Sequence, residues 1–181
     1  METSELVILL DKNGEQVGTA EKSTVHTTDT PLHLAFSCHI FNEGGHVLIT
    51  RRALTKKTWP GVWTNSVCGH PGPGEAMENA IRRRALDELG LELRKITEAL
   101  PDFRYRAVDA SGIVENEICP VFLALATTDP SPATEEVCEW EWVEPSSLQD
   151  SVGKTPFVFS PWLVDQLEQW KGPYGFDTSV R

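Results

Sequence analysis

Long hydrophobic runs and excess positive charge are both missing from this sequence. No stretch approaches the roughly 18 to 20 consecutive apolar residues that span a bilayer. Residues 1–5 include acidic side chains and lack the basic-then-apolar order of a signal peptide. With 16 Lys and Arg against 27 Asp and Glu, the net charge of −11 argues against a surface for nucleic acid or anionic lipid. We therefore expect a cytoplasmic protein that binds neither nucleic acid nor a membrane, and whose few clustered cations could still hold a small anion.

Cysteine motifs, repeats and linkers are missing as well. The four cysteines show no C-x-x-C spacing, so neither a zinc ribbon nor a redox motif is indicated. No internal repeat, low-complexity run or linker interrupts the 181 residues, a length suited to one domain with its own hydrophobic core. We predict a single domain over residues 1–181 that acts as a monomer. Residues 171–181 carry Gly, Pro and Ser and are expected to fray.

Short apolar segments separated by turn residues make up most of the chain. Strands are predicted at residues 6–10, 32–41, 47–52, 103–106, 115–126 and 139–143. The turn sequences at 11–14 and 42–45 fit hairpin connections. Residues 55–75 are rich in Gly, Pro and Trp without a sustained period, which indicates a structured loop. Strands on both sides of one strong helix predict an α/β (α+β) fold, a sandwich of mixed β-sheets with flanking helices.

That helix is predicted over residues 75–89, with Gly90 placed to end it. A second helix is expected to begin at Ser160-Pro161-Trp162, because Pro is favoured at the first helical position. The core-facing stripe of the first helix consists of Met77, Ala80, Ile81, Ala85 and Leu89. Arg84 and Glu88 fall within this stripe, where a charge is costly unless it is paired or coordinated. Either the two form a purely structural ion pair, or this helix face lines a site for metal and phosphate.

The spacing around the helix favours a metal and phosphate site. Gly69, Glu75 and Arg83, followed by Asp-Glu-Leu-Gly-Leu at 87–91, resemble the Nudix box, G-x5-E-x7-R-E-U-x-E-E-x-G-U, in which U is a bulky aliphatic residue. The chain departs from the box where Arg84 replaces the first Glu of the R-E pair, and where Ala85 is smaller than the usual aliphatic residue. The resemblance implies a Nudix-type sandwich. Replacing a carboxylate by Arg would weaken metal-assisted hydrolysis and add a cation suited to phosphate.

Three histidines and two glutamates form a further candidate set. Glu115 and Glu117 are separated by one residue on a predicted strand, so both project from the same face. Imidazole and carboxylate ligands suit a divalent metal such as Mn²⁺, Mg²⁺ or Zn²⁺. A structural role is the alternative for any one of the histidines. We predict a metal site formed by His26, His33, His70, Glu115 and Glu117.

Three segments carry a closer resemblance. Thr-Asn-Ser-Val-Cys-Gly-His-Pro at 64–71, Phe-Arg-Tyr-Arg at 103–106 and Gly-Ile-Val-Glu-Asn-Glu at 112–117 resemble the type I isopentenyl-diphosphate isomerases. The similarity covers nearly the whole chain, from Leu6 to about Trp170. It implies interconversion of isopentenyl and dimethylallyl diphosphate through a tertiary carbocation. It also implies Mg²⁺ and one further divalent metal, Mn²⁺ or Zn²⁺, as cofactors.

The same resemblance implies roles for individual residues. Cys68 and the pair Glu117/Tyr105 would act as acid and base on opposite faces of the substrate, with Glu117 also touching the metal. Trp162 would present its ring to the carbocation, unless it only anchors the last helix. Glu88 and Cys68 would belong to a second site, for Mg²⁺ bound with the diphosphate. The cations that would hold the diphosphate are Lys22, Arg52, Lys56 and Arg84.

Two other functions share parts of this pattern. A Nudix hydrolase acting on a diphosphate-linked metabolite would have the same fold, so fold alone does not decide between them. The missing first Glu of the box and the presence of Cys68, Glu115 and Glu117 count against it. A catalytically silent binding module is disfavoured because every candidate acid, base and ligand is retained. Nothing resembles the barrel of the flavin-dependent isomerases.

Overall fold

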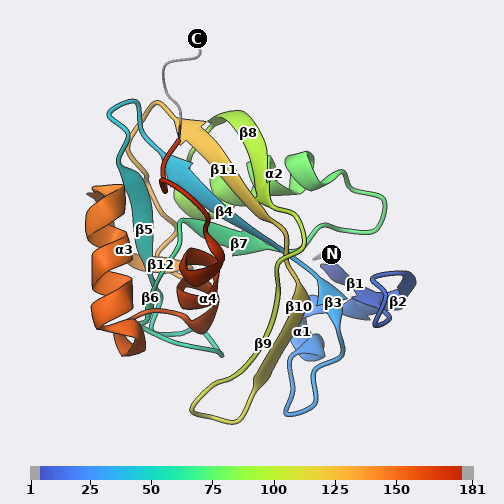
Figure 1. The fold of residues 1–181 in the computed structure, drawn as a ribbon. Coiled ribbons are helices and arrows are strands. Elements are labelled where there is room, and N and C mark those ends of the chain that lie inside the picture. The colour runs from blue at the N-terminus through green and yellow to red at the C-terminus, as the bar shows by residue number, and fades with distance from the viewer. Residues whose placement is uncertain (1–4, 177–181) are drawn as a thin grey trace.

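The computed structural model describes residues 5–176, which form two mixed β-sheets and the helices that flank them (Figure 1). The smaller sheet has the strand order β2-β1-β3-β10-β9 and contains β1 (Leu6–Leu10), β2 (Gln16–Glu21), β3 (His33–Leu34), β9 (Arg104–Val108) and β10 (Val114–Ile118). The larger sheet has the order β12-β5-β4-β11-β8, with β6 paired to β5 and β7 paired to β4. Its strands are β4 (Phe36–Phe41), β5 (Val47–Arg52), β6 (Trp63–Thr64), β7 (Val67–Gly69), β8 (Leu93–Leu100), β11 (Val121–Ala126) and β12 (Val137–Val143).

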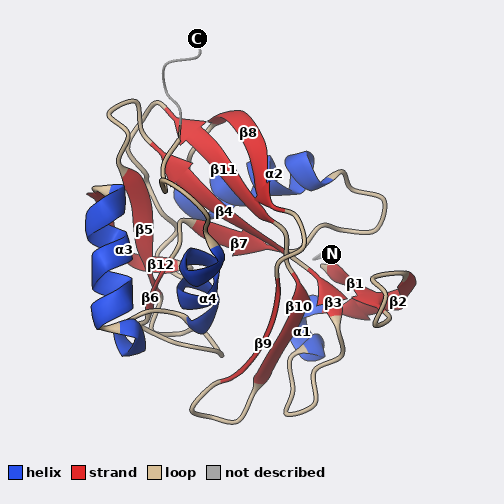
Figure 2. Ribbon diagram, viewed as in Figure 1, coloured by secondary structure: helices blue, strands red, loops and turns tan. Residues whose placement is uncertain are grey.

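The larger sheet is covered by helices on both faces, as Figure 2 shows. These helices are α2 (Met77–Leu89), α3 (Pro145–Lys154) and α4 (Pro161–Gln169), while α1 (Lys22–Val25) follows β2 and the 3-10 helix η1 (Pro156–Val158) follows α3. Along β5, Leu48 packs in the core beside α2, whereas Val47 and Ile49 pack in the core beside α3 and α4. This alternation is the period of two expected of a strand buried on both faces. The predicted sandwich of mixed sheets with flanking helices is therefore confirmed.

Two chain segments cross together from one sheet to the other. β3 pairs with β10 in the smaller sheet and β4 pairs with β11 in the larger one, both in parallel. At the crossing, Ala35 N donates to Ile118 O at 2.9 Å and Ser37 N donates to Pro120 O at 3.1 Å. The prediction of single strands over 32–41 and 115–126 was wrong, because each segment divides at this crossing. Pro120 has no N–H to continue a ladder, and it lies where the second segment changes sheets.

Helix α2 ends as the sequence predicts and begins two residues later than predicted. Gly90 adopts a left-handed conformation with φ 65°, and its N–H caps the last turn. The predicted stripe is buried or packed against the core, and Arg84 and Glu88 are buried within it. The predicted start of the last helix is confirmed, since Ser160 is the N-cap and its side chain accepts from Leu163 N.

Several elements were not predicted. Strand β8 is mostly exposed and carries Lys95 at φ 44°, so it lacks the alternation that marks a strand. Helix α3 buries only Leu148 and Val152, too few for a clear helical stripe. Of the expected tail, residues 177–181 lie outside the described part, whereas Tyr174 is buried against Phe41. No helix within residues 5–176 is long and apolar enough to cross a membrane.

Candidate active site

A cavity of about 670 Å³ opens among residues from both sheets, α2 and α4. Most of the predicted site residues line it: Lys22, His26, Arg52, Lys56, Cys68, His70, Arg84, Glu88, Tyr105, Glu115, Glu117 and Trp162. His33 does not line the cavity and is fully buried. The fold thus gathers predicted site residues from distant parts of the chain, such as Lys22 and Trp162.

Four of the five predicted metal ligands converge on one point. His26, His33, His70 and Glu117 each offer a ligand atom, and these atoms all lie within 4.8 Å of one another. Strand pairing explains part of this, because His33 on β3 is in register with Glu117 on β10. Glu117 Oε1 lies 3.3 Å from His33 Nε2 and 3.1 Å from His70 Nε2. Glu115 is outside the group of four, with its Oε2 3.0 Å from His26 Nε2.

The donor set of this group suits a divalent metal. His33 Nδ1 lies 2.9 Å from the carbonyl oxygen of Pro31, which can only accept, so Nδ1 carries the proton and Nε2 keeps its lone pair. His26 Nε2, His33 Nε2 and His70 Nδ1 are buried and make no hydrogen bond within residues 5–176. A buried polar atom without a partner costs about 1–3 kcal/mol, and a metal ion would satisfy such lone pairs. The residues present therefore fit a bound metal.

The charge state of the group follows from burial and from mutual contacts. Burial would raise the pKa of Glu117, but His33 and His70 hold that pKa well below its usual range. Burial would lower the pKa of His33, but the adjacent carboxylate of Glu117 outweighs burial and raises that pKa. For His70 burial prevails, and the pKa is lowered despite Glu117. Glu117 is thus a carboxylate at neutral pH, the form required of a base or a metal ligand.

Two protonated groups lie near this carboxylate. Tyr105 on β9 is in register with Glu117, and burial, followed by the charge of Glu117, raises the Tyr105 pKa well above its usual value. Cys68 on β7 is in register with Ser37, and burial raises the pKa of its thiol to about 12. Both groups therefore carry their protons at neutral pH, and each can donate one.

Trp162 supplies an aromatic wall. It is only 3% exposed, and its ring centroid lies 5.3 Å from that of Trp59 and 5.7 Å from that of Tyr105. Its Nε1 donates to Asn65 Oδ1 at 3.0 Å, which fixes the plane of the ring. The side chain both lines the cavity and anchors α4 in a buried cluster, so the two interpretations of this residue are compatible.

The predicted phosphate-binding cations lie at the cavity with partners of their own. Lys22 Nζ lies 2.5 Å from a carboxylate oxygen of Glu5. Lys56 pairs with Glu136, and the predicted Arg84–Glu88 pair is present. Arg52 donates to backbone carbonyl oxygens of residues 58 and 59.

Sequence reasoning missed several residues of this site. Glu5 and Glu136 belong to no motif, and their contacts with the cations arise from distant parts of the chain. Asn65 lies inside a recognised segment, which gave no sign that it holds Trp162. Thr58 donates from its hydroxyl to Glu115. No sequence pattern marks this residue, which is one threonine in a Gly- and Trp-rich loop.

Comparisons with known proteins agree with this arrangement. Residues 31–163 match the NUDIX domain family. A crystal structure of DR0079 from Deinococcus radiodurans superposes with a TM-score of 0.70 at 19% identity, covering 91% of this chain and 98% of that one. A MutT protein from Methanosarcina mazei gives a TM-score of 0.59 at 20% identity, covering 77% of this chain and 92% of that one. These two likenesses concern the fold alone.

Curated relatives are much more similar in sequence. The isopentenyl-diphosphate Delta-isomerase of Kocuria rhizophila is 59% identical over 167 residues, covering 92% of this chain and 93% of the relative. The protein of the same name from Corynebacterium glutamicum is 62% identical over 168 residues, covering 90% and 89%. That from Clavibacter michiganensis is 62% identical over 164 residues, covering 91% and 84%. The chain therefore belongs to the NUDIX domain family and, within it, to the isopentenyl-diphosphate Delta-isomerases.

Proposed function

We propose that the protein interconverts isopentenyl diphosphate and dimethylallyl diphosphate by adding a proton to one carbon and removing one from another. The observation that carries this proposal is the position of Glu117, which lies between His33 and Tyr105 in strand register and shares a cavity with Cys68. An ionised carboxylate, a protonated thiol and a protonated phenol are the groups that a proton transposition needs. The names of the curated relatives support the same reaction.

The proton balance assigns one task to each face of the substrate. The terminal alkene carbon of isopentenyl diphosphate gains a proton, a tertiary carbocation forms, and the carbon next to the oxygen-bearing one loses a proton. Cys68 acts on one face, and Glu117 with Tyr105 acts on the other. Because the reaction is reversible, the group that donates in one direction accepts in the other. Burial of Trp162, whose ring packs against Tyr105, supports the exclusion of water, which would otherwise quench the carbocation.

Two metal sites complete the proposal. His26, His33, His70, Glu115 and Glu117 would hold the first ion, Mn²⁺ or Zn²⁺, and Glu88 with Cys68 would hold Mg²⁺ together with the diphosphate. When bound, the first ion supplies positive charge that tunes the acidity of Glu117. The unpartnered histidine nitrogens support the first site. The place of Glu88 on the cavity wall supports the second.

Binding of the substrate would rest on charge at one end and on an aromatic ring at the other. Lys22, Arg52, Lys56 and Arg84 line the cavity and would contact the diphosphate. The Trp162 ring would face the carbocation, a contact worth about 2 kcal/mol or more in a desolvated pocket. Arg52 Cζ already lies 5.5 Å from the centroid of this ring, which supports its use as a surface for cations.

A product assay tests this function directly. Purified protein incubated with isopentenyl diphosphate, Mg²⁺ and Mn²⁺ should accumulate an acid-labile allylic diphosphate without releasing inorganic phosphate. The variant Glu117→Gln, in which an NH2 group replaces one carboxylate oxygen, should form no allylic product under the same conditions. Release of phosphate without an allylic product would instead assign the chain to the hydrolases of its fold.

A further inference from the structure

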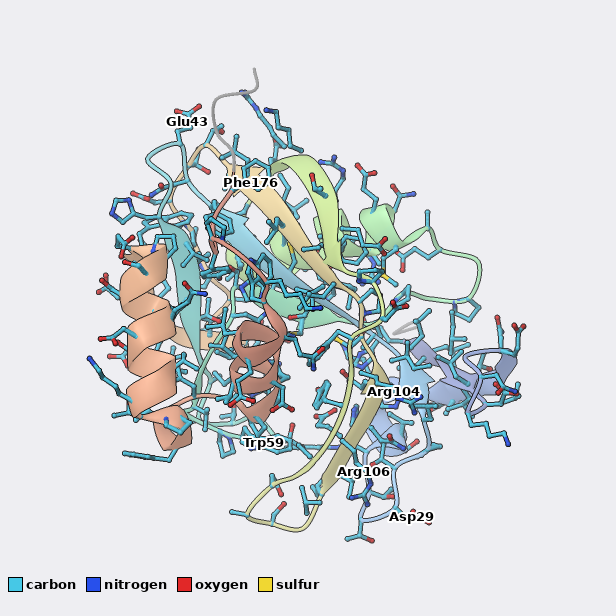
Figure 3. All side chains as sticks on the ribbon, viewed as in Figure 1. Asp29, Glu43, Trp59, Arg104, Arg106 and Phe176 are labelled. Carbon is cyan, nitrogen blue, oxygen red and sulfur yellow. The ribbon has the colours of Figure 1, made fainter. Side chains whose placement is uncertain are left out.

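Thr58 lies in the loop between β5 and β6 and makes a direct contact with a predicted metal ligand. Its side chain is buried, and its Oγ1 donates to Glu115 Oε1 at 3.0 Å. The next residue, Trp59, packs edge-on against Trp162, which fixes the loop against α4. Figure 3 labels Trp59 and shows this part of the loop below α4, close to the arm formed by β9 and β10.

The direction of the Thr58 hydrogen bond is set by a third residue. Arg52 Nη2 donates to Thr58 Oγ1 at 3.3 Å and to the Thr58 carbonyl oxygen at 2.9 Å. A guanidinium can only donate, so the hydroxyl accepts from Arg52 and must direct its one proton to another group. Glu115 Oε1 is the acceptor within reach. The three side chains form a chain of hydrogen bonds in which Arg52 donates to Thr58 and Thr58 donates to Glu115.

This chain fixes which oxygen of Glu115 faces the histidines. With Oε1 held by Thr58, the other oxygen, Oε2, lies 3.0 Å from His26 Nε2, one of the buried nitrogens without a hydrogen bond within residues 5–176. A carboxylate free to rotate about its last torsion would present either oxygen, or neither, to the same point. The threonine hydroxyl therefore removes one degree of freedom from a ligand that lies at the edge of the four-residue group.

We propose that Thr58 is a positioning residue for the metal site, whose hydroxyl orients Glu115 so that one carboxylate oxygen is presented to a divalent cation beside His26. The inference rests on the proposed function in one respect, that the His/Glu group binds such a cation. Outer partners of metal ligands typically change metal affinity by about 10- to 100-fold when they are removed. We expect an effect of that size for the Thr58 hydroxyl.

The substitution Thr58→Val tests the hydroxyl with nearly unchanged side-chain shape. Folded protein loaded with Mn²⁺ is dialysed against a graded series of a chelator of known affinity, and the retained manganese is measured by mass spectrometry. Thr58→Val should bind Mn²⁺ about 10- to 100-fold more weakly than wild type. Thr58→Ser, which keeps the hydroxyl, should bind like wild type. Thr50→Val is the matched control, because within residues 5–176 the hydroxyl of this buried threonine bonds only to carbonyl oxygens of residues 65 and 66.

Two outcomes would overturn the inference. Equal manganese retention by Thr58→Val and wild type would show that the hydroxyl does not orient a ligand. Equal weakening in Thr58→Val and Thr58→Ser would show that the hydroxyl alone does not account for the effect, and would assign it to packing of the loop at this position. The metal site itself is tested separately by His70→Ala, which removes one of the four converging ligands. Wild-type retention by that variant would contradict the proposed site, whatever Thr58→Val does.

Discussion

His33 and Glu117 occupy the same register position on the parallel strands β3 and β10, and Glu117 Oε1 lies 3.3 Å from His33 Nε2. On the other side of β10, Tyr105 holds the matching position on β9. Side chains at one register position project from the same face of a sheet. The proposed metal ligand His33, the carboxylate of Glu117 and the phenol of Tyr105 thus stand in one row across three strands. Glu117 and Tyr105 line the cavity, and His33 is buried beside them.

Replacing Cys68 by Ala should separate chemistry from structure. If the thiol transfers a proton, turnover should fall by about 10²- to 10⁴-fold, as is typical of a positioned acid or base. The melting temperature should change little, because loss of one sulfur atom opens only a small cavity. Steady-state kinetics and thermal unfolding measure the two effects. Cys138→Ala, which removes an exposed thiol, is the control and should match wild type. Near-normal turnover of Cys68→Ala would leave both proton transfers to Glu117 and Tyr105.

Removal of metal should lower stability as well as activity. Without a bound ion, the buried histidine nitrogens have no bonding partner in the described part of the chain, which destabilises the folded state. A chelator should therefore lower the melting temperature. His70→Ala should retain less metal and show a smaller drop in melting temperature on chelation. Metal content and thermal unfolding, each with and without chelator, are the measurements. His46→Ala, at an exposed histidine, should behave like wild type. A chelator effect on stability that is equal in His70→Ala and wild type would contradict a metal role for His70.

The buried pair of Arg84 and Glu88 should respond strongly when one partner is removed. Their side chains are 10% and 11% exposed. Arg84→Leu would leave Glu88 buried without that partner and should destabilise the fold by about 3–5 kcal/mol. In the double variant Arg84→Leu/Glu88→Leu no charge is left uncompensated at this pair, and most of that stability should return. Urea unfolding of the two variants and wild type gives the free energies. A double variant no more stable than the single one would show that the pair does not act as a unit.

Stability should also depend on pH through His39. Its ring is fully buried, bonded through Nε2 to Gln166 Oε1 at 2.8 Å and through Nδ1 to the hydroxyl of Tyr174 at 2.5 Å. Burial lowers the pKa of His39 from its ordinary value of 6.5 to about 4. As pH falls from 6.5 toward 4, the unfolded chain takes up this proton and the folded chain does not. Stability is therefore complete above pH 6.5 and declines by up to roughly 3 kcal/mol as pH falls to 4.

Urea unfolding at a series of pH values measures this dependence. His39→Gln has no titrating group at the position and should show a shallower loss of stability between pH 6.5 and 4. His46→Gln, at an exposed histidine, should keep the slope of wild type. The same slope in His39→Gln and wild type would mean that other groups account for the acid sensitivity. Comparing the variants cancels the contribution of carboxylates such as Glu144, whose pKa is lowered to about 2 by hydrogen bonds from Ser146 and Ser147.

Local patterns in the sequence were enough to predict α2, its terminal Gly90 and the N-cap of α4, because period and capping residues lie within a few positions of one another. Pairings between distant strands were not predicted. The strand-like segment at 115–126 continues through a change of sheet at Pro120, so the local pattern gave one strand where there are two. Most residues of the candidate site came from resemblance to a family. Thr58 and Glu5 could not be found this way, because their roles arise only when loops far apart in the chain meet.

The shared crossing of β3–β4 and β10–β11 links the proposed metal ligands to the centre of the core. His33 and Glu117 stand at one end of these paired segments, and the other end is the buried middle of the larger sheet. The amide protons of Ala35 and Ser37, bonded across the crossing, should therefore be among the slowest in the molecule to exchange with solvent. Opening this hydrogen-bond network would disrupt the ligand group and the core of the larger sheet in the same event. A bound metal should therefore slow amide hydrogen exchange deep inside the larger sheet as well as at the ligands.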